Sequence, residues 1–197
     1  MMKALAAFII LMLATAYYFF FYPPVLLERK TAAALDQFTA AIETKDRAKI
    51  GETLKTLLSD DAKIRLEISF FSITQSNNPP LVQDFDKEQF LSFIDNTLYP
   101  LTDYGYYNVL KSFVPAADRQ SAQVFFSSHE WGDGKNYYGG TAVAMRFSSA
   151  TDCDGTVTFA GTGVQLRNVI CKLQFRAVPK PEELGKIQGN ADAMREF

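Results

Sequence analysis

His129, the only histidine of the chain, is the first candidate for chemistry. It lies late in a predicted strand, residues 121–131, and its imidazole could act as a general base if a phenol such as Tyr104 or Tyr106 lies nearby. Side chains alternate along a strand, so Glu130 faces the other way and cannot readily orient the imidazole. The alternative, which we favour, is a surface or hydrogen-bonded strand histidine beside a hairpin. A single histidine also excludes a metal site built on a histidine pair within one chain, and no metal is expected.

Asp103 is the second candidate, because Tyr104, Tyr106 and Tyr107 follow it closely. A carboxyl group buried beside phenols can serve as an acid or a base. The alternative, which we again favour, is a loop aspartate after a helix, with the tyrosines completing the core or lining a pocket. The sequence contains no phosphate-binding loop, nucleophile elbow or dinucleotide-binding motif, so no cofactor is expected.

The two cysteines, Cys153 and Cys171, have a spacing with a geometric meaning. Residues 155–175 are typical of two strands around a glycine-rich turn. If that turn is centred on Thr162, paired residues have numbers that add up to 324, as those of the two cysteines do. The cysteines would then face each other across an antiparallel pair, within reach of a disulfide. The alternative is two free buried thiols, since cysteine also serves as a small apolar residue.

The start of the chain indicates a membrane anchor. Residues 4–22 carry no charge, and the last six of them are aromatic. As a helix this run would be roughly 28 Å long, close to the hydrocarbon thickness of a bilayer, about 30 Å. Tyrosines suit the headgroup boundary, and Pro23-Pro24 would end the helix. We therefore predict that residues 1–24 form one transmembrane helix whose partner is the lipid bilayer. The alternative is a secretory signal cleaved near Ala14-Thr15-Ala16.

The predicted orientation depends on the short N-terminal tail, which carries Lys3. Such a tail before a first helix usually stays in the cytoplasm. We therefore expect a single pass through the inner membrane with the C-terminal domain in the periplasm. If the segment is a cleaved signal, the domain is secreted instead.

The rest of the chain is long enough for one domain, predicted at residues 25–178, and ends in a polar tail, residues 179–197, that we expect to be mobile. The 20 basic and 22 acidic side chains leave a formal net charge of −2. No strongly basic patch accompanies this balance, so nucleic acid is not expected as a partner.

Helical patterns come first in the predicted domain and strand patterns follow. Helical periodicity covers residues 26–44, then 46–58 with Asp46 as N-cap, and then 86–99, where Asp86 and Gln89 form a capping box flanked by Phe85 and Phe90. A strand over residues 62–73 separates the second and third helices. The later predicted strands are residues 104–114, 121–131, 137–148, 156–160 and 164–178, with hairpin turns at 118–120 and 132–135. This order predicts an α+β fold in which three N-terminal helices pack on a curved, mostly antiparallel sheet.

The same order resembles the nuclear transport factor 2-like superfamily of cone-shaped α+β domains. The stretch from Phe38 to Ala62, in which a helix, the capping Asp46, a second short helix and the acidic turn Ser59-Asp60-Asp61 lead into a strand, is similar to the opening of many such domains. The resemblance covers roughly residues 30–178. It implies a cone with an apolar interior, where enzymes of the superfamily often place a His, Asp or Tyr to move protons. Other members bind ligands or serve as protein-binding scaffolds.

From these observations we expect a membrane-anchored periplasmic binding or scaffold domain, without catalysis, acting with another envelope protein or as a homodimer. The alternative is an isomerase-, dehydratase- or cyclase-like enzyme, or a carrier of an apolar ligand, using a pocket inside the cone. If the protein is an enzyme, the catalytic candidates are His129, Asp103 and Tyr104.

Overall fold

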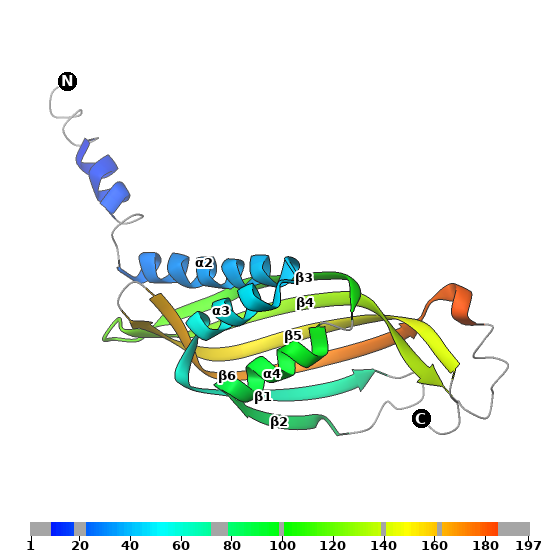
Figure 1. Ribbon diagram of the computed structural model, residues 1–197. Helices are drawn as coiled ribbons and strands as arrows, with labels where there is room; N and C mark the ends of the chain where they lie inside the picture. The colour runs from blue at the N-terminus through cyan, green and yellow to red at the C-terminus, as the bar shows by residue number, and fades with distance from the viewer. Residues whose placement is uncertain are drawn as a thin grey trace.

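The computed structural model describes residues 9–17, 23–71, 79–98, 101–138, 141–160 and 163–184. After a helical segment at residues 9–17, the labelled elements follow in the order α2 (Pro23–Glu43), α3 (Arg47–Leu57), β1 (Leu58–Phe71), β2 (Leu81–Asp86), α4 (Lys87–Leu98), β3 (Thr102–Pro115), β4 (Ser121–Tyr138), β5 (Thr141–Ala160), β6 (Gly163–Pro179) and the short 3₁₀ helix η1 (Pro181–Glu183). Helices on one face of a sheet confirm the α+β class (Figure 1).

The sheet has six strands in the order β2-β1-β6-β5-β4-β3. Neighbouring strands are antiparallel except β1 and β6, which run parallel. Helix α2 lies along β3, and α4 packs against β1 and β2 (Figure 1). The sheet is therefore mixed but mostly antiparallel, and the helices form a second layer over one of its faces.

The predicted helix caps are confirmed. The carboxylate of Asp46 accepts hydrogen bonds from two backbone N–H groups in the first turn of α3. Asp86 and Gln89 each accept a hydrogen bond from the other's backbone N–H, at 2.9 and 3.0 Å, so the capping box is complete. Phe85 and Phe90 pack edge to face around it, with ring centroids 6.0 Å apart. Local side-chain chemistry thus begins both short helices.

The predicted hairpin turn at residues 132–135 is wrong, because β4 runs straight through this stretch. Its glycines serve close packing instead of a turn. A Cβ atom on Gly132 would lie 3.1 Å from the Cβ of Leu101, and one on Gly134 would lie 2.7 Å from the ring of Phe147. Consequently β4 and β5 are longer than the predicted strands at residues 121–131, 137–148 and 156–160.

Two smaller boundaries also differ from the predictions. β1 begins at Leu58, so the predicted break at residues 59–61 belongs to the strand, and its pairing with β6 is irregular between Leu58 and Lys63. The edge strand β2 was not predicted, because its side chains are mostly exposed and carry no clear alternation of burial. The predicted turn at residues 118–120 is confirmed, with Arg119 in the left-handed region at φ 58°.

Cys153 and Cys171 form the predicted disulfide, with their Cα atoms 4.1 Å apart. They pair directly across β5 and β6 and are buried in the main core. The turn differs from the expected one, since Ala160 pairs with Gly163 and the ladder is one residue out of the expected register. An irregularity between Gly155 and Val157 restores the register at the cysteines.

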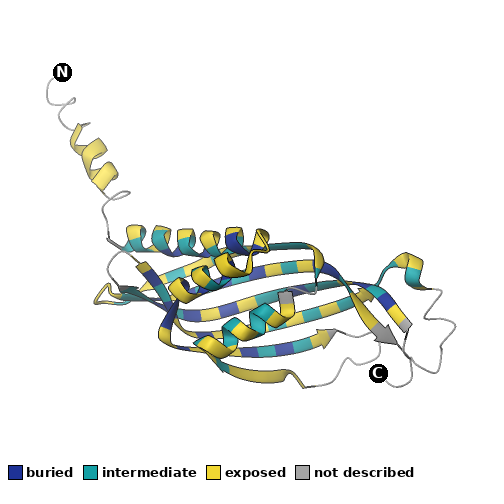
Figure 2. Ribbon diagram, in the orientation of Figure 1, coloured by how far each residue is buried: buried dark blue, intermediate teal, exposed yellow. Residues whose placement is uncertain are grey.

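The core lies between the helices and the inner face of the sheet. Buried and exposed positions alternate along the central strands, as expected where one face of a sheet is covered (Figure 2). Main-core side chains include Leu35, Leu54, Leu66, Phe126 and Val157.

The predicted anchor falls only partly on described residues, because 4–8 and 18–22 are outside them. Residues 9–17 are helical, and the side chains of Ile9–Leu13 are exposed. Among the described residues, no helix combines the length and apolar character needed to cross a bilayer. Most of the polar tail, residues 185–197, also lies outside the described residues. The membrane anchor therefore stays a prediction.

Candidate ligand cavity

A cavity of about 450 Å³ lies between the helices and the inner face of the sheet. This volume is within the range of small-molecule sites, about 300–1,000 Å³. The cavity walls come from α2, α3, α4 and every strand except β2, and nearly all of the lining side chains are apolar. The polar exceptions are Thr97, Tyr104, Tyr106, Ser128, Glu130 and Thr151.

Five of these six polar side chains lie together on β3, β4 and β5. Strand pairing sets Tyr106 opposite Glu130, and Glu130 opposite Ser149, so these three residues form one row across the sheet. Ser128 and Thr151 form the next row. Because side chains repeat every two residues along a strand, both rows face the cavity. The sheet thus gathers the polar groups of the cavity on one wall.

Glu130 carries the only charge among the described lining residues. Its Oε2 accepts a hydrogen bond from the Tyr104 hydroxyl at 3.1 Å, and its Oε1 accepts one from the Ser149 hydroxyl at 2.8 Å. Over the described residues, no lysine, arginine or histidine forms an ion pair with this carboxylate. Each carboxylate oxygen has further acceptor capacity. Glu130 is therefore held in place and still able to accept a proton.

The two tyrosines differ from the carboxylate in what they can do. Burial raises the pKa of the Tyr104 phenol far above its usual range, and the charge and hydrogen bond of Glu130 raise this pKa further. Burial is also the main cause of the raised pKa of Tyr106, although Ser128 partly opposes it. Both phenols therefore stay protonated at neutral pH and act as hydrogen-bond donors.

Asn108 fixes the strand that carries these tyrosines against α2. Its Nδ2 donates to the backbone oxygen of Leu35 at 2.8 Å and to Oγ1 of Thr39 at 2.5 Å. The Phe38 ring packs edge to face on Tyr106, with centroids 5.7 Å apart. These contacts limit how far the phenol of Tyr106 can move.

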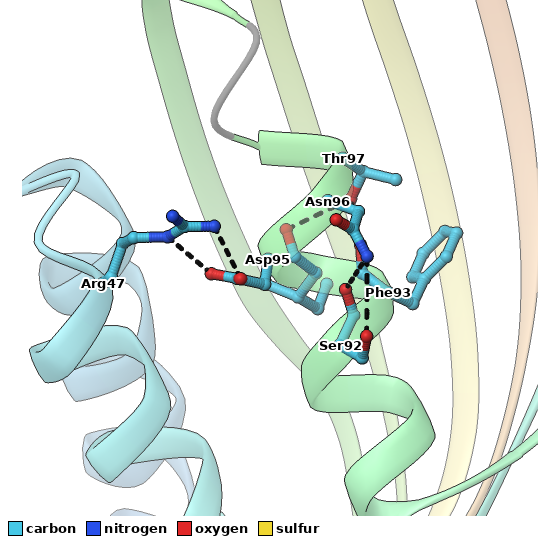
Figure 3. Close-up of polar contacts among 7 residues, drawn as sticks. Arg47, Ser92, Phe93, Asp95, Asn96 and Thr97 are labelled. Atoms are coloured by element: carbon cyan, nitrogen blue, oxygen red, sulfur yellow. Dashed lines mark hydrogen bonds and ion pairs between the residues drawn. The ribbon is translucent and has the colours of Figure 1, made fainter.

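Helix α4 closes the cavity on the opposite side and is tied to α3 by a bidentate ion pair. Nε and Nη2 of Arg47 lie 2.7 and 2.6 Å from the two carboxylate oxygens of Asp95. Figure 3 shows Asp95 directed toward α3, while Phe93 points the other way, toward the strands. Phe93 and Thr97 line the cavity. One face of α4 thus anchors the helix and another shapes the cavity.

Of the three predicted catalytic candidates, only Tyr104 lines the cavity. His129 is exposed on the opposite face of the sheet, where its ring stacks on Tyr107 with centroids 5.0 Å apart. Asp103 is exposed as well, in the left-handed backbone region at φ 46°. Neither side chain lies in the cavity with Tyr104, so the structure does not bring the three together.

The residue missed as a candidate is Glu130. Strand alternation already placed Glu130 on the face opposite His129. That placement was used only to conclude that Glu130 cannot orient the imidazole, and Glu130 was not considered as a site residue itself. The signal for a cavity position was present in β4, where Val124, Phe126 and Ser128 share the face of Glu130 and the first two are apolar. A single carboxylate that continues an inward-facing apolar row is a candidate site residue.

Comparisons with known proteins support the fold. No protein-family model matches the sequence, and no curated protein matches it. Among solved structures, hexachlorocyclohexane dehydrochlorinase LinA-type3 from Novosphingobium barchaimii LL02 is similar with a TM-score of 0.52 and 9% identity, over 81% of this chain and 94% of that one. A putative scytalone dehydratase from Novosphingobium aromaticivorans DSM 12444 is similar with a TM-score of 0.52 and 6% identity, over 79% and 87%. A type 2 hexachlorocyclohexane dehydrochlorinase gives a TM-score of 0.52 and 9% identity, over 81% and 92%. The chain therefore shares its overall fold with these solved structures, in agreement with the predicted α+β architecture.

Proposed function

We propose that this protein is a small-molecule enzyme of the isomerase or dehydratase kind, which removes a proton from a bound substrate with Glu130 as the base. The observation that carries the proposal is one carboxylate, without a cationic partner among the described residues, on the wall of an apolar cavity beside two protonated phenols. The names of the structural neighbours, a dehydrochlorinase and a putative dehydratase, support the same class of reaction.

The roles of the residues follow from their contacts. Tyr104 and Ser149 hold the carboxylate of Glu130 by its two oxygens, so little reorientation is needed for it to take a proton from substrate carbon. The electron pair left on carbon forms a double bond, either in an enolate whose oxygen takes the negative charge or by expelling a leaving group, and Glu130 then returns its proton to carbon or releases it to the leaving group or to solvent. Tyr106, opposite Glu130 across the strand pair, is placed to donate a hydrogen bond to the oxygen or leaving group that gains negative charge. An apolar cavity excludes water and strengthens both interactions.

A second candidate function, a carrier of an apolar ligand, uses the same cavity. The observation that favours it is the predominance of apolar side chains in the cavity walls. A carrier requires no proton transfer, so a carrier would bind without turnover. The non-catalytic scaffold expected from the sequence has less support, because the interior is not filled by its Phe and Tyr side chains. The membrane anchor predicted at residues 4–22 is compatible with each of these functions and remains part of our proposal.

The proposal is tested by hydrogen exchange and elimination in heavy water. The full-length protein would be incubated with a panel of alicyclic ketones, alcohols and chlorides. Mass spectrometry would follow deuterium gained at carbon and the loss of water or hydrogen chloride. We expect Glu130→Gln, which keeps the shape of the side chain, to lower the rate by about 100-fold or more, as is typical for loss of a general base. His129→Gln is the matched control on the same strand, and it should keep the full rate because His129 lies on the other face. An unchanged rate in Glu130→Gln would refute the assignment.

A further inference from the structure

The charge of the cavity limits what can bind there. Glu130 supplies a negative charge, and no described lining residue is a lysine, arginine or histidine. Among the described residues, no cationic side chain of the surrounding elements lines the cavity, and three of them form ion pairs with aspartates that do not line it either: Lys87 with Asp60, Arg146 with Asp133, and Arg167 with Asp61. The interior is thus apolar with an uncompensated negative charge.

An anionic ligand would meet two penalties in such a site. Its charge would lose water without gaining a cationic partner, and it would lie near a fixed carboxylate whose repulsion is poorly screened away from solvent. A ligand with a positive charge would meet neither penalty in full. Glu130 would pair with the cation, and the rings of Tyr104 and Tyr106 could contribute cation–π attraction. A neutral ligand would need only a hydrogen-bonding group.

The position of the polar wall also orients the ligand. Beyond the rows of Glu130 and Ser128, the next row of β4, β5 and β6 holds Phe126 and the disulfide, all of them buried. The row of Glu130 continues through Ser149 and Phe175 to Phe70 on β1, and Phe70 is 57% exposed, so the end of the cavity at this row is the more accessible one. A ligand therefore places its apolar body toward the disulfide and its polar group at Glu130.

We propose that the cavity selects its ligand by charge: it accepts an apolar molecule whose polar end is neutral or positively charged, and it rejects carboxylates and phosphates. This inference rests on the proposed function, because it names the class of substrate for the same site. It concerns binding alone, so it can fail or hold independently of whether Glu130 abstracts a proton.

The test uses three probes that share one rigid apolar body: 1-adamantanol, 1-adamantanamine and 1-adamantanecarboxylate. Their binding to the full-length protein would be measured by calorimetry at pH 7.5, where the amine is protonated and the acid is ionised. We expect the alcohol and the amine to bind at least about 100-fold more tightly than the carboxylate, given the strength of unscreened charge repulsion at short range. In Glu130→Gln the preference for the amine over the carboxylate should fall by at least about tenfold, because only the charge has been removed.

Two controls keep the outcome clear. A thermal melt of Glu130→Gln shows that the variant is folded, and His129→Gln should keep the wild-type preference. Carboxylate binding within about threefold of alcohol binding in the wild type would overturn the inference, as would failure of all three probes to bind. Loss of deuterium exchange in Glu130→Gln together with equal binding of all probes would leave the catalytic proposal intact and overturn charge selection alone.

Discussion

Removal of the disulfide gives the most quantitative prediction. Cys153 and Cys171 close a loop with a sequence separation of 18 residues. In the chain-entropy model a loop of this length contributes about 3 kcal/mol to the free energy of unfolding. At about 2–4 °C per kcal/mol for a chain of this size, the melting temperature should fall by about 6–12 °C. We therefore expect a clear loss of stability in the double variant Cys153→Ala/Cys171→Ala.

The assay is urea denaturation of the variant, of oxidised wild-type protein and of reduced wild-type protein. The reduced wild type is the essential control, because it loses the cross-link while both sulfur atoms stay in the buried core. We expect the reduced protein to lose about 3 kcal/mol and the alanine variant to lose somewhat more, since it also loses buried volume. A count of free thiols in denatured, non-reduced protein should give none.

The reasoning would be refuted if reduction changed the free energy of unfolding by less than about 1 kcal/mol. That result would mean that the hairpin of β5 and β6 keeps its ends together in the unfolded chain without the cross-link. Two reactive thiols in the non-reduced protein would refute the disulfide itself.

Three further predictions concern charges, caps and the membrane. Hydrogen bonds from Arg146 and Lys180 lower the pKa of Asp133 from 3.8 to about 2. The ionised carboxylate therefore stabilises the fold above about pH 4, and this stabilisation is lost as the pH falls through 2. In pH-dependent denaturation the stability difference between wild type and Asp133→Asn should therefore narrow toward pH 2, and a constant difference would contradict the assignment. Asp46→Ala should lower the free energy of unfolding by about 1 kcal/mol through loss of the cap of α3, measured by the same denaturation, with Asp46→Asn as the control that keeps most of it. If residues 4–22 anchor the chain in the predicted orientation, a reporter that is fused after Phe197 and is active only in the cytoplasm should stay silent. Reporter activity would show that the orientation is the opposite one.

Predictions from the sequence succeeded where short-range chemistry decides the structure. The caps at Asp46 and Asp86 depend on hydrogen bonds within one helical turn, so the residue types alone indicate them. The disulfide of Cys153 and Cys171 was predicted from a pairing register of β5 and β6 that holds at the cysteines but is one residue off near the turn. The irregularity between Gly155 and Val157 brought the cysteines back into register, and no local signal of the sequence indicated it.

Predictions failed where distant packing decides. Gly132 and Gly134 look like turn residues, yet they leave space for Leu101 and Phe147, and neither contact can be derived from neighbouring sequence. Glu130 was assigned correctly to the face opposite His129. The covering of that face by helices makes Glu130 the candidate base, and this depends on tertiary packing.

The length of β4 has a consequence for how the sequence of this protein could evolve. Glu130 lies within an 18-residue strand that is paired on both sides, so its backbone is held by two ladders. The facing wall comes from helices α2, α3 and α4, whose side chains can change without disturbing those ladders. Substitutions such as Phe93→Leu on α4 would reshape the cavity while the carboxylate stays where it is. The fold therefore places the proposed base on the sheet and much of the side-chain surface that shapes the cavity on the helices, so the two can vary separately.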